Sequence, residues 1–266
     1  MGIHIERVTT MDGCKKCQYL ASTVWGGDAA CSTAQMIVHA TYGGVVLLAY
    51  DEHTPIGFLF SFPAKYREEW VLWSHETAVL PAYLHRGIGQ SLKETQRSTA
   101  RELGYGTIAW TFDPLVARNA YFNLHKLGAR IVEYKRNVYG SDMADQINRG
   151  METDRFVALW DTMDGSTVTA RNLVHSHFEA ISVLTTSHSG APILTDSWPK
   201  STEHLTTDVP LDFTQLILHD ARRAEEWRLS FRAAAEQLME VGYTPAVLQR
   251  HADKATYIWI KEEPQS

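Results

Sequence analysis

The sequence of 266 residues predicts an α+β protein, in which a mixed β-sheet carries helices on both sides. Stretches that alternate like β-strands, such as residues 3–8 and 106–112, are separated by stretches with the apolar spacing of helices. Up to Tyr139 the predicted order is strand, two helices, three strands, helix, strand, helix, strand. Hydrophobic residues form 44% of the chain, which is enough to bury a core at this length.

The chain opens with a predicted strand at 3–8, and two helices follow it. Thr10 can cap a helix that runs to about Val24, and Ser32 can cap a second helix that runs to about Tyr42. Glycine pairs come after both helices and predict their ends.

Three strands are predicted next. Residues 45–50 and 55–62 should pair as a hairpin, because only a short polar segment separates them. The charged residues 65–69 predict a loop. A central strand then starts at Trp70 and has to stop before Pro81, since proline cannot donate to a sheet ladder.

The turn after the central strand contains two glycines, Gly87 and Gly89, and leads into a predicted helix that Gly104 ends. One face of this helix is predicted to carry Ile88, Leu92, Thr95, Thr99 and Leu103. A strand, a glycine-containing turn and a helix place backbone amides and the positive end of a helix dipole around one spot, which suits a phosphate. A plain strand-to-helix turn fits this feature equally well.

The rest of the first domain is predicted as a strand at 106–112, a helix at 115–127 and a strand at 129–139. Composition changes at Asp161, so we expect two domains, 1–160 and 161–266.

The second domain should be a small α/β lobe. Residues 185–210 are predicted to be irregular with short strands. Asp220 can cap a helix whose stripe of Trp227, Phe231, Ala234 and Leu238 faces a core, and two strands near 245–249 and 256–261 end the chain. Such a lobe should dock on the first domain or on a second copy of the chain, so a homodimer is one expectation.

Charge and hydropathy exclude several classes of function. The net charge of −6 argues against nucleic acid as a partner, because that role needs a basic face. No apolar run approaches the ~20 residues of a membrane span, and the first residues lack the core of a signal peptide, so we expect a soluble, cytoplasmic protein without a membrane partner. Cys14 and Cys17 form a lone CxxC, for which buried thiols are favoured over a metal or redox site, and we expect no metal.

The run from Val79 to Gly89, followed by Leu92, resembles the acyl-CoA signature of the GNAT superfamily of N-acyltransferases. Two positions depart from that signature. Leu84 stands where the family has Arg or Gln, and His85 stands where it often has Gly. The resemblance implies the GNAT fold and an acyl-CoA cosubstrate. The residues implied to bind the cosubstrate in this segment are Val79, Arg86, Gly87, Ile88, Gly89 and Gln90.

A second segment, 119–129, looks like another signature of the same family, with Leu124 where the family has a Tyr. Further segments, among them 209–213 and 227–232, resemble the branch associated with o-succinylbenzoate synthase and N-succinylamino acid racemase. The resemblance to the superfamily covers about residues 1–160. The resemblance to the branch includes, in addition, the two C-terminal segments. It implies direct transfer of an acetyl or succinyl group from CoA to the amine of a small molecule such as an amino acid.

An amine that attacks a thioester needs a base, and the central strand offers two. His75 is the first choice, because some members of the family place a histidine there and a neutral imidazole can accept a proton. In a regular strand Trp73, His75 and Thr77 share one face and Glu76 lies on the other. Glu76 is the reserve base if a bulge inverts the strand faces. A histidine with a purely structural hydrogen bond is the alternative for His75.

The other roles are less constrained by the residues. Tyr121 could give a proton to the leaving thiolate or could be a packed aromatic side chain, and Asn119 could contact the pantetheine arm or cap a helix. Arg118, Arg136 and Arg228 are candidates for a succinyl carboxylate, although each is more often a solvated surface charge.

The alternative is a degenerate GNAT module that binds acyl-CoA or a protein without turnover. Leu84 and Leu124 favour it, because both depart from the family signatures. A dinucleotide-binding domain would need a longer glycine set.

Overall fold

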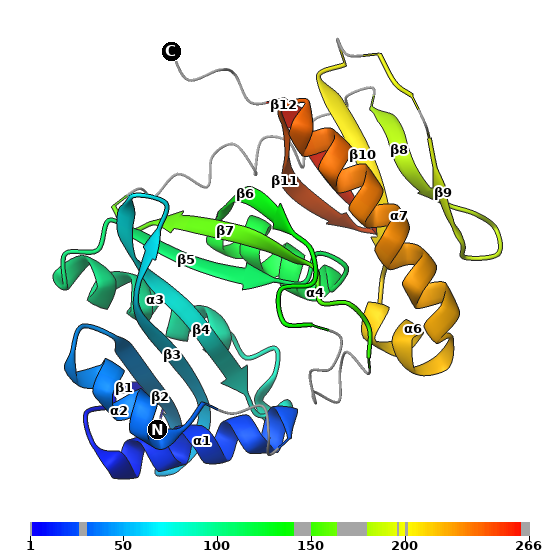
Figure 1. The fold of residues 1–266 in the computed structure, drawn as a ribbon. Helices are drawn as coiled ribbons and strands as arrows, with labels where there is room; N and C mark the ends of the chain where they lie inside the picture. Colours follow the sequence, from blue (N-terminus) through cyan, green and yellow to red (C-terminus); the bar gives the residue numbers. More distant parts are fainter. Residues whose placement is uncertain are drawn as a thin grey trace. The chain divides into compact units, whose positions relative to one another are not determined.

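The computed structural model describes residues 2–26, 31–140, 150–163, 180–195, 197–199 and 202–261. These residues form an α+β structure with mixed sheets, as the sequence predicts (Figure 1). They divide into two compact units. The first holds the described residues up to Trp110 together with 159–163, and the second holds the remainder from Thr111 onward. The domain boundary predicted at residue 160 stays a prediction.

The elements that begin in the first unit are β1 (Ile3–Arg7), α1 (Met11–Trp25), α2 (Thr33–Thr41), β2 (Val45–Asp51), β3 (Thr54–Tyr66), β4 (Glu69–Val79), the 3₁₀ helix η2 (Pro81–Tyr83), α3 (Ile88–Glu102) and β5 (Thr107–Phe112). Thr10 accepts a hydrogen bond from the amide of Gly13, and Ser32 accepts one from the amide of Gln35. Both predicted helix caps are therefore confirmed.

The strands of the first unit pair in the order β1-β2-β3-β4-β5. The first four are antiparallel neighbours, whereas β4 and β5 are parallel. Helices α1 and α2 contact one face of this sheet and α3 contacts the other, as Figure 1 shows. The sheet is covered on both faces, which explains why β2 is buried at almost every position.

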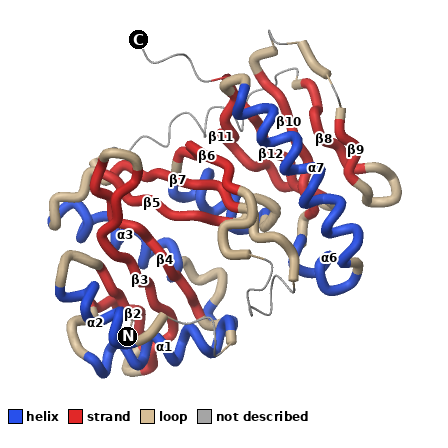
Figure 2. Tube along the Cα trace, viewed as in Figure 1, coloured by secondary structure: helices blue, strands red, loops and turns tan. Residues whose placement is uncertain are grey.

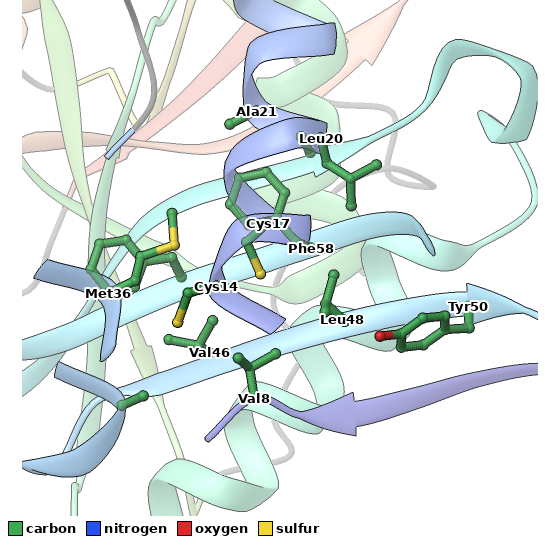
Figure 3. Close-up of a cluster of buried hydrophobic side chains, with 13 residues drawn as sticks. Val8, Cys14, Cys17, Leu20, Ala21, Met36, Val46, Leu48, Tyr50 and Phe58 are labelled. Carbon is green, nitrogen blue, oxygen red and sulfur yellow. The ribbon is translucent and has the colours of Figure 1, made fainter. Parts of the chain in front are cut away.

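A cluster of buried apolar side chains joins α1 and α2 to the sheet (Figure 3). Cys14 and Cys17 are both fully buried in it, among Met36, Val46 and Phe58. The three cysteines are free thiols. Buried thiols, as predicted for the CxxC, are thus what the structure has at these two positions.

The second unit contains α4 (Ala117–Tyr121), the π-helix η3 (Phe122–Leu127), β6 (Arg130–Lys135), most of β7 (Arg155–Asp161), β8 (Ile181–Thr186), β9 (Pro192–Leu194), β10 (His204–Pro210), α6 (Phe213–His219), α7 (Ala221–Glu240), β11 (Tyr243–Arg250) and β12 (Lys254–Lys261). β5 and β7 each run across the boundary between the units, within a sheet of order β1-β2-β3-β4-β5-β7-β6. Figure 2 shows the strands and helices of the second unit along the chain.

A second sheet, of order β11-β12-β10-β8-β9, belongs wholly to the second unit. Its β8 and β10 are parallel, and its other neighbours are antiparallel. Helix α7 contacts β8, β9, β10 and β11 through a buried stripe that includes Trp227 and Phe231. Asp220 caps α7 by accepting a hydrogen bond from the amide of Arg223, so the predicted cap and stripe are confirmed.

Buried ion pairs tie α7 to the residues after β5. Arg228 is 1% exposed and donates to both carboxylate oxygens of Asp113, at 2.9 and 2.6 Å. Asp113 also accepts a hydrogen bond from the amide of Leu115, so it fixes the turn at the end of β5. The reading of Arg228 as a surface charge is wrong, because α7 buries its guanidinium against this carboxylate.

Several predicted boundaries need correction. Residues 65–69 are not a loop, since β3 continues to Tyr66 and β4 already begins at Glu69. The strand β7 was not predicted, and residues 185–210 contain the regular strand β10. No helix in the part of the chain that the structure describes is long and apolar enough to cross a membrane.

Candidate functional site

The turn between β4 and α3 leaves the first amides of α3 uncapped. After β4 the chain makes the single turn η2, and His85 and Gly87 then take left-handed conformations with φ of 66° and 79°. Gly87 is the N-cap residue of α3, and no side chain accepts a hydrogen bond from the first turn of the helix. The amides at the positive end of the helix dipole therefore need a partner from outside the chain or from water.

The space beside these amides is open. A Cβ atom built on Gly87 or on Gly89 would meet no other atom within 4 Å. Ile88 points inward and is 2% exposed, whereas the guanidinium of Arg86 lies over the ring of Tyr83 at 4.9 Å from the centroid. The residues present fit an anion such as a diphosphate, held by amides and one arginine. We call this segment, Arg86 to Gly89, the anion cradle.

Other predicted binding residues differ in their surroundings. The side-chain amide of Gln90 donates a hydrogen bond to Glu94 at 2.8 Å. Its side chain is therefore already bonded within the helix, and its backbone amide is the group left for the cradle. Leu84, at the position where the family has Arg or Gln, is 37% exposed and has no polar side-chain atom for a phosphate.

Strands β4 and β5 pair over a short stretch only. Their recorded pairs are Leu72 with Ile108 and Trp73 with Ala109. β4 continues to Val79, and from Ser74 onward it has no partner in β5 among the described residues. The β4 amides that point away from β3 along this stretch are thus free to bind something other than a strand.

A β-bulge lies in β4 at His75. In β3 the neighbours Phe60 and Ser61 pair with Glu76 and Ser74, so His75 is the inserted residue. Directly paired residues share a face, which places Glu76 with Phe60 on the side of α1 and α2, and Ser74 with Ser61 on the side of α3. The regular alternation predicted for this strand, with Ser74 and Glu76 on one face, is corrected by the bulge.

Glu76 is a buried carboxyl group, and one of its oxygens has no partner in the part of the chain that the structure describes. It is 8% exposed, and its Oε1 accepts a hydrogen bond from the amide of Cys31 at 3.1 Å. Its Oε2 is buried without a hydrogen-bond partner among the described residues. Burial raises the pKa of Glu76 to about 7, although the hydrogen bond from Cys31 acts in the opposite direction. The group can therefore change its protonation state near neutral pH.

His75 lies beside Glu76 on the same side of the sheet. Its Nε2 is 4.0 Å from Oε1 of Glu76, and its ring packs against Phe60 and Phe62. Burial, and then the nearby His39, lower the pKa of His75. The imidazole is consequently neutral at pH 7, and the bulge brings the two predicted bases together.

Tyr121 and Asn119 lie on α4 in the second unit. The ring of Tyr121 stacks on His125 with the centroids 4.6 Å apart. Val116 is the N-cap of α4, so the helix-cap reading of Asn119 is wrong. Leu124 is 1% exposed, which makes the residue in the family's Tyr position part of the core.

Sequence reasoning missed two groups near the bulge. The amide of Cys31 left no signal, because a backbone donor cannot be read from residue type. Lys93, buried on α3, could have been found. A spacing of four from Ile88 gives Leu92, Gln96 and Ala100, and Lys93 lies on the same face because it precedes Gln96 by three residues and Ala100 by seven. The apolar face predicted for this helix, which includes Thr95, Thr99 and Leu103, is wrong at its end, because Leu103 is 40% exposed.

Solved structures of acetyltransferases are similar to part of this chain. The N-acetyltransferase from Staphylococcus aureus Mu50 is 15% identical, and the match covers 62% of this chain and 100% of that chain with a TM-score of 0.47. A GNAT family acetyltransferase from Elizabethkingia anophelis with acetyl-CoA bound is 19% identical, with 60% and 97% covered and a TM-score of 0.45. For the ribosomal-protein-S18-alanine N-acetyltransferase from Escherichia coli the identity is 15%, the covered shares are 63% and 99%, and the TM-score is 0.48. The sequence matches no protein-family model and no curated protein.

Proposed function

We propose that the protein is a CoA-dependent N-acyltransferase that moves an acetyl or succinyl group from acyl-CoA directly to the amine of a small molecule. The observation that carries this proposal is the anion cradle, whose uncapped amides come one short turn after a strand that has no parallel partner along its last residues. A diphosphate at the cradle would leave the rest of the cosubstrate free to run along the unpaired amides of β4.

The chain would hold the cosubstrate mostly with backbone groups. The amides of Gly87, Ile88, Gly89 and Gln90 suit the diphosphate, with Arg86 as the nearby cation. The amides of β4 toward Val79 suit the pantetheine arm and can polarise a carbonyl group. Acyl-CoA supplies an activated acyl group. Since Leu84 contributes no charge, binding should depend on the cradle amides more than it would with an arginine there.

Glu76 suits the role of general base. An amine must lose a proton to form an amide, and a carboxylate with a pKa of about 7 and a free Oε2 can accept it. The amide of Cys31 holds the other oxygen in place. We propose Glu76 as the base and neutral His75 as its neighbour in the amine site, which reverses the order of preference that a regular strand suggested.

Direct transfer is proposed because Cys31 makes a poor nucleophile. It is the only cysteine of the described residues that is not fully buried, and burial raises the pKa of its thiol to about 11. A thiol in that state carries almost no thiolate at neutral pH.

A non-catalytic module that binds acyl-CoA is the second candidate. It is favoured by Leu84, which is exposed two residues before the cradle, at the position where the signature has Arg or Gln. The two candidates share the binding site for CoA, so a binding measurement cannot distinguish them. A measurement of turnover can.

The test measures thermal unfolding with CoA, acetyl-CoA and succinyl-CoA, and then the release of free thiol with a panel of amines that includes amino acids. We expect stabilisation by the CoA compounds and thiol release with at least one amine. Stabilisation without thiol release from any amine would support the binding module. The absence of any stabilisation would contradict both.

A further inference from the structure

A lysine side chain is buried in the first unit without an acidic partner. Lys93, on α3, is 5% exposed. Its Nζ donates a hydrogen bond to Oγ of Ser74 at 2.8 Å and lies 4.1 Å from the centroid of the Trp110 ring. None of the ion pairs among the described residues includes Lys93. A buried ammonium without a carboxylate is costly to keep, so its position calls for a reason.

Lys93 touches both strands at the point where they part. The last recorded pair of β4 and β5 joins Trp73 to Ala109. Ser74 and Trp110 are the next residue on each strand, and Lys93 contacts both of them. A ligand that lies along the unpaired stretch of β4 and reaches its start would come to the two residues that Lys93 contacts.

Further polar groups lie on the face of the sheet that Lys93 contacts. Gln96, one turn further along α3, is fully buried, and neither its amide nitrogen nor its oxygen has a partner among the described residues. The strands packed against this face present Ser74 from β4, Ser61 from β3 and, from β1, Arg7, which is exposed. A buried amide with no partner indicates that something polar completes this region.

The cradle and Lys93 stand at opposite ends of the unpaired stretch. Val79, before the cradle, and Ser74, beside Lys93, are five positions apart, which is ~17 Å of strand. A diphosphate at the cradle would therefore send the thioester end of its pantetheine arm toward Ser74 and Lys93.

This inference rests on the proposed function. We propose that Lys93 is a catalytic acid that protonates the sulfur of CoA as the thioester is cleaved. The amine nitrogen forms its bond to the acyl carbon, and Glu76 accepts the proton that the nitrogen loses. The bond between acyl carbon and sulfur then breaks with its electron pair on sulfur, which takes a proton from Nζ. Solvent returns a proton to Lys93 and removes one from Glu76, so the products are an amide and the free thiol.

The chemistry of Lys93 suits this step. Burial lowers its pKa to about 7. An ammonium in that range gives up its proton much more readily than an exposed lysine, and a thiolate with an ordinary pKa of ~8.5 accepts it. Acid and base would both titrate near pH 7, which predicts a bell-shaped dependence of turnover on pH.

The first experiment compares Lys93→Met with the unchanged protein and with the control Lys15→Met, which removes an exposed lysine from α1. We expect Lys93→Met to fold, to bind CoA with similar affinity by calorimetry, and to lose ~100-fold or more in kcat, since that is the usual contribution of a general acid. Lys93→Arg should not restore turnover, because a guanidinium does not release its proton. Full activity in either variant at position 93 would overturn the proposal.

A second measurement does not depend on turnover, and its main comparison needs only the unchanged protein. The thiol of bound CoA is titrated by the ultraviolet absorbance of its thiolate. We expect a lower thiol pKa in the complex than for free CoA, and a return toward the free value in Lys93→Met. Equal values for bound and free CoA in the unchanged protein would contradict contact with Lys93. If the unchanged protein binds no CoA, the proposed function itself fails, whereas normal turnover in Lys93→Met refutes only this inference.

Tyr121→Phe separates Lys93 from the acid implied by the family resemblance. Retained activity in Tyr121→Phe together with loss in Lys93→Met supports Lys93. The opposite pattern, loss in Tyr121→Phe and activity in Lys93→Met, assigns the proton to Tyr121 and refutes the proposal.

Discussion

Glu76 has its properties because of one extra residue in β4. The bulge at His75 turns the Glu76 carboxyl group toward α1 and α2, where it is buried and meets the amide of Cys31. Burial raises its pKa, the hydrogen bond orients it, and the free Oε2 remains able to accept a proton. A base that is half ionised near neutral pH follows from these three local facts.

Replacing Glu76 by Gln keeps the size of the side chain and removes the base. We expect kcat to fall by ~100-fold or more, with the affinity for CoA unchanged, because Glu76 is not part of the cradle. His75→Gln should cost less, since we place His75 beside the base. Steady-state thiol release and calorimetry check both variants. A larger loss for His75→Gln than for Glu76→Gln would return the role of base to the histidine.

The same carboxyl group makes stability depend on pH. Its pKa rises from 4.5 to about 7 on folding, so its favourable contribution is complete below pH 4.5 and is lost as pH rises toward 7. Glu76→Gln removes this loss, and we expect the variant to be more stable than the unchanged protein by about 3 kcal/mol at pH 8. Urea unfolding at pH 5 and pH 8 measures the difference. An equal effect of the substitution at both pH values would show that Glu76 does not titrate in this way.

At the scale of elements, the start of α3 should bind the anion with backbone groups alone. Gly89→Leu places a side chain in open space beside the amides, so the fold should be kept while CoA binding weakens at least ~10-fold, or 1.4 kcal/mol. Ser91→Leu adds the same side chain to an exposed position of the same helix and serves as the control. Calorimetry with CoA compares the two. Equal affinity in both variants would place the diphosphate elsewhere.

The end of β5 and helix α7 are joined by the ion pair of Asp113 and Arg228. Removing one partner of a buried pair leaves the other charge uncompensated, so Arg228→Met should destabilise the protein by about 3 kcal/mol. Arg222→Met, which removes an exposed arginine from the same helix, should change stability little. Urea unfolding monitored by Trp fluorescence checks the pair of variants. Similar stability of the two would mean that the ion pair contributes nothing net.

Elements with a local signal were predictable from the sequence. The caps Thr10, Ser32 and Asp220 mark their helices through a single hydrogen bond each, and Pro81 ends β4 because of its missing amide. The sequence alone could not place the bulge at His75, because the inserted residue is defined by the pairing of β4 with β3. A bulge therefore enters the sequence-based prediction only as the condition under which Glu76 would be the base. Burial of Arg228 was not predictable for a similar reason, because Asp113 lies far away in the sequence.

At the scale of the molecule, the described residues form two compact units, and β5 and β7 each have residues in both. The cradle, the bulge, Glu76 and Lys93 all belong to the first unit, which therefore holds every group to which we assign cosubstrate binding or proton transfer. Tyr121 and Asn119 belong to the second unit. The sequence indicated the cradle through its glycines, but the contacts of Lys93 with Ser74 and Trp110 could be seen only in the folded chain.

The central claim is that the diphosphate of CoA binds the amides at the start of α3 and that its sulfur reaches the bulge. A crystal structure of the protein with CoA tests this most directly. We predict the diphosphate within hydrogen-bond distance of the amides of Gly87 to Gly89 and the sulfur beside Lys93 and Glu76. CoA bound away from this turn, or bound there with its sulfur pointing away from β4, would contradict the account.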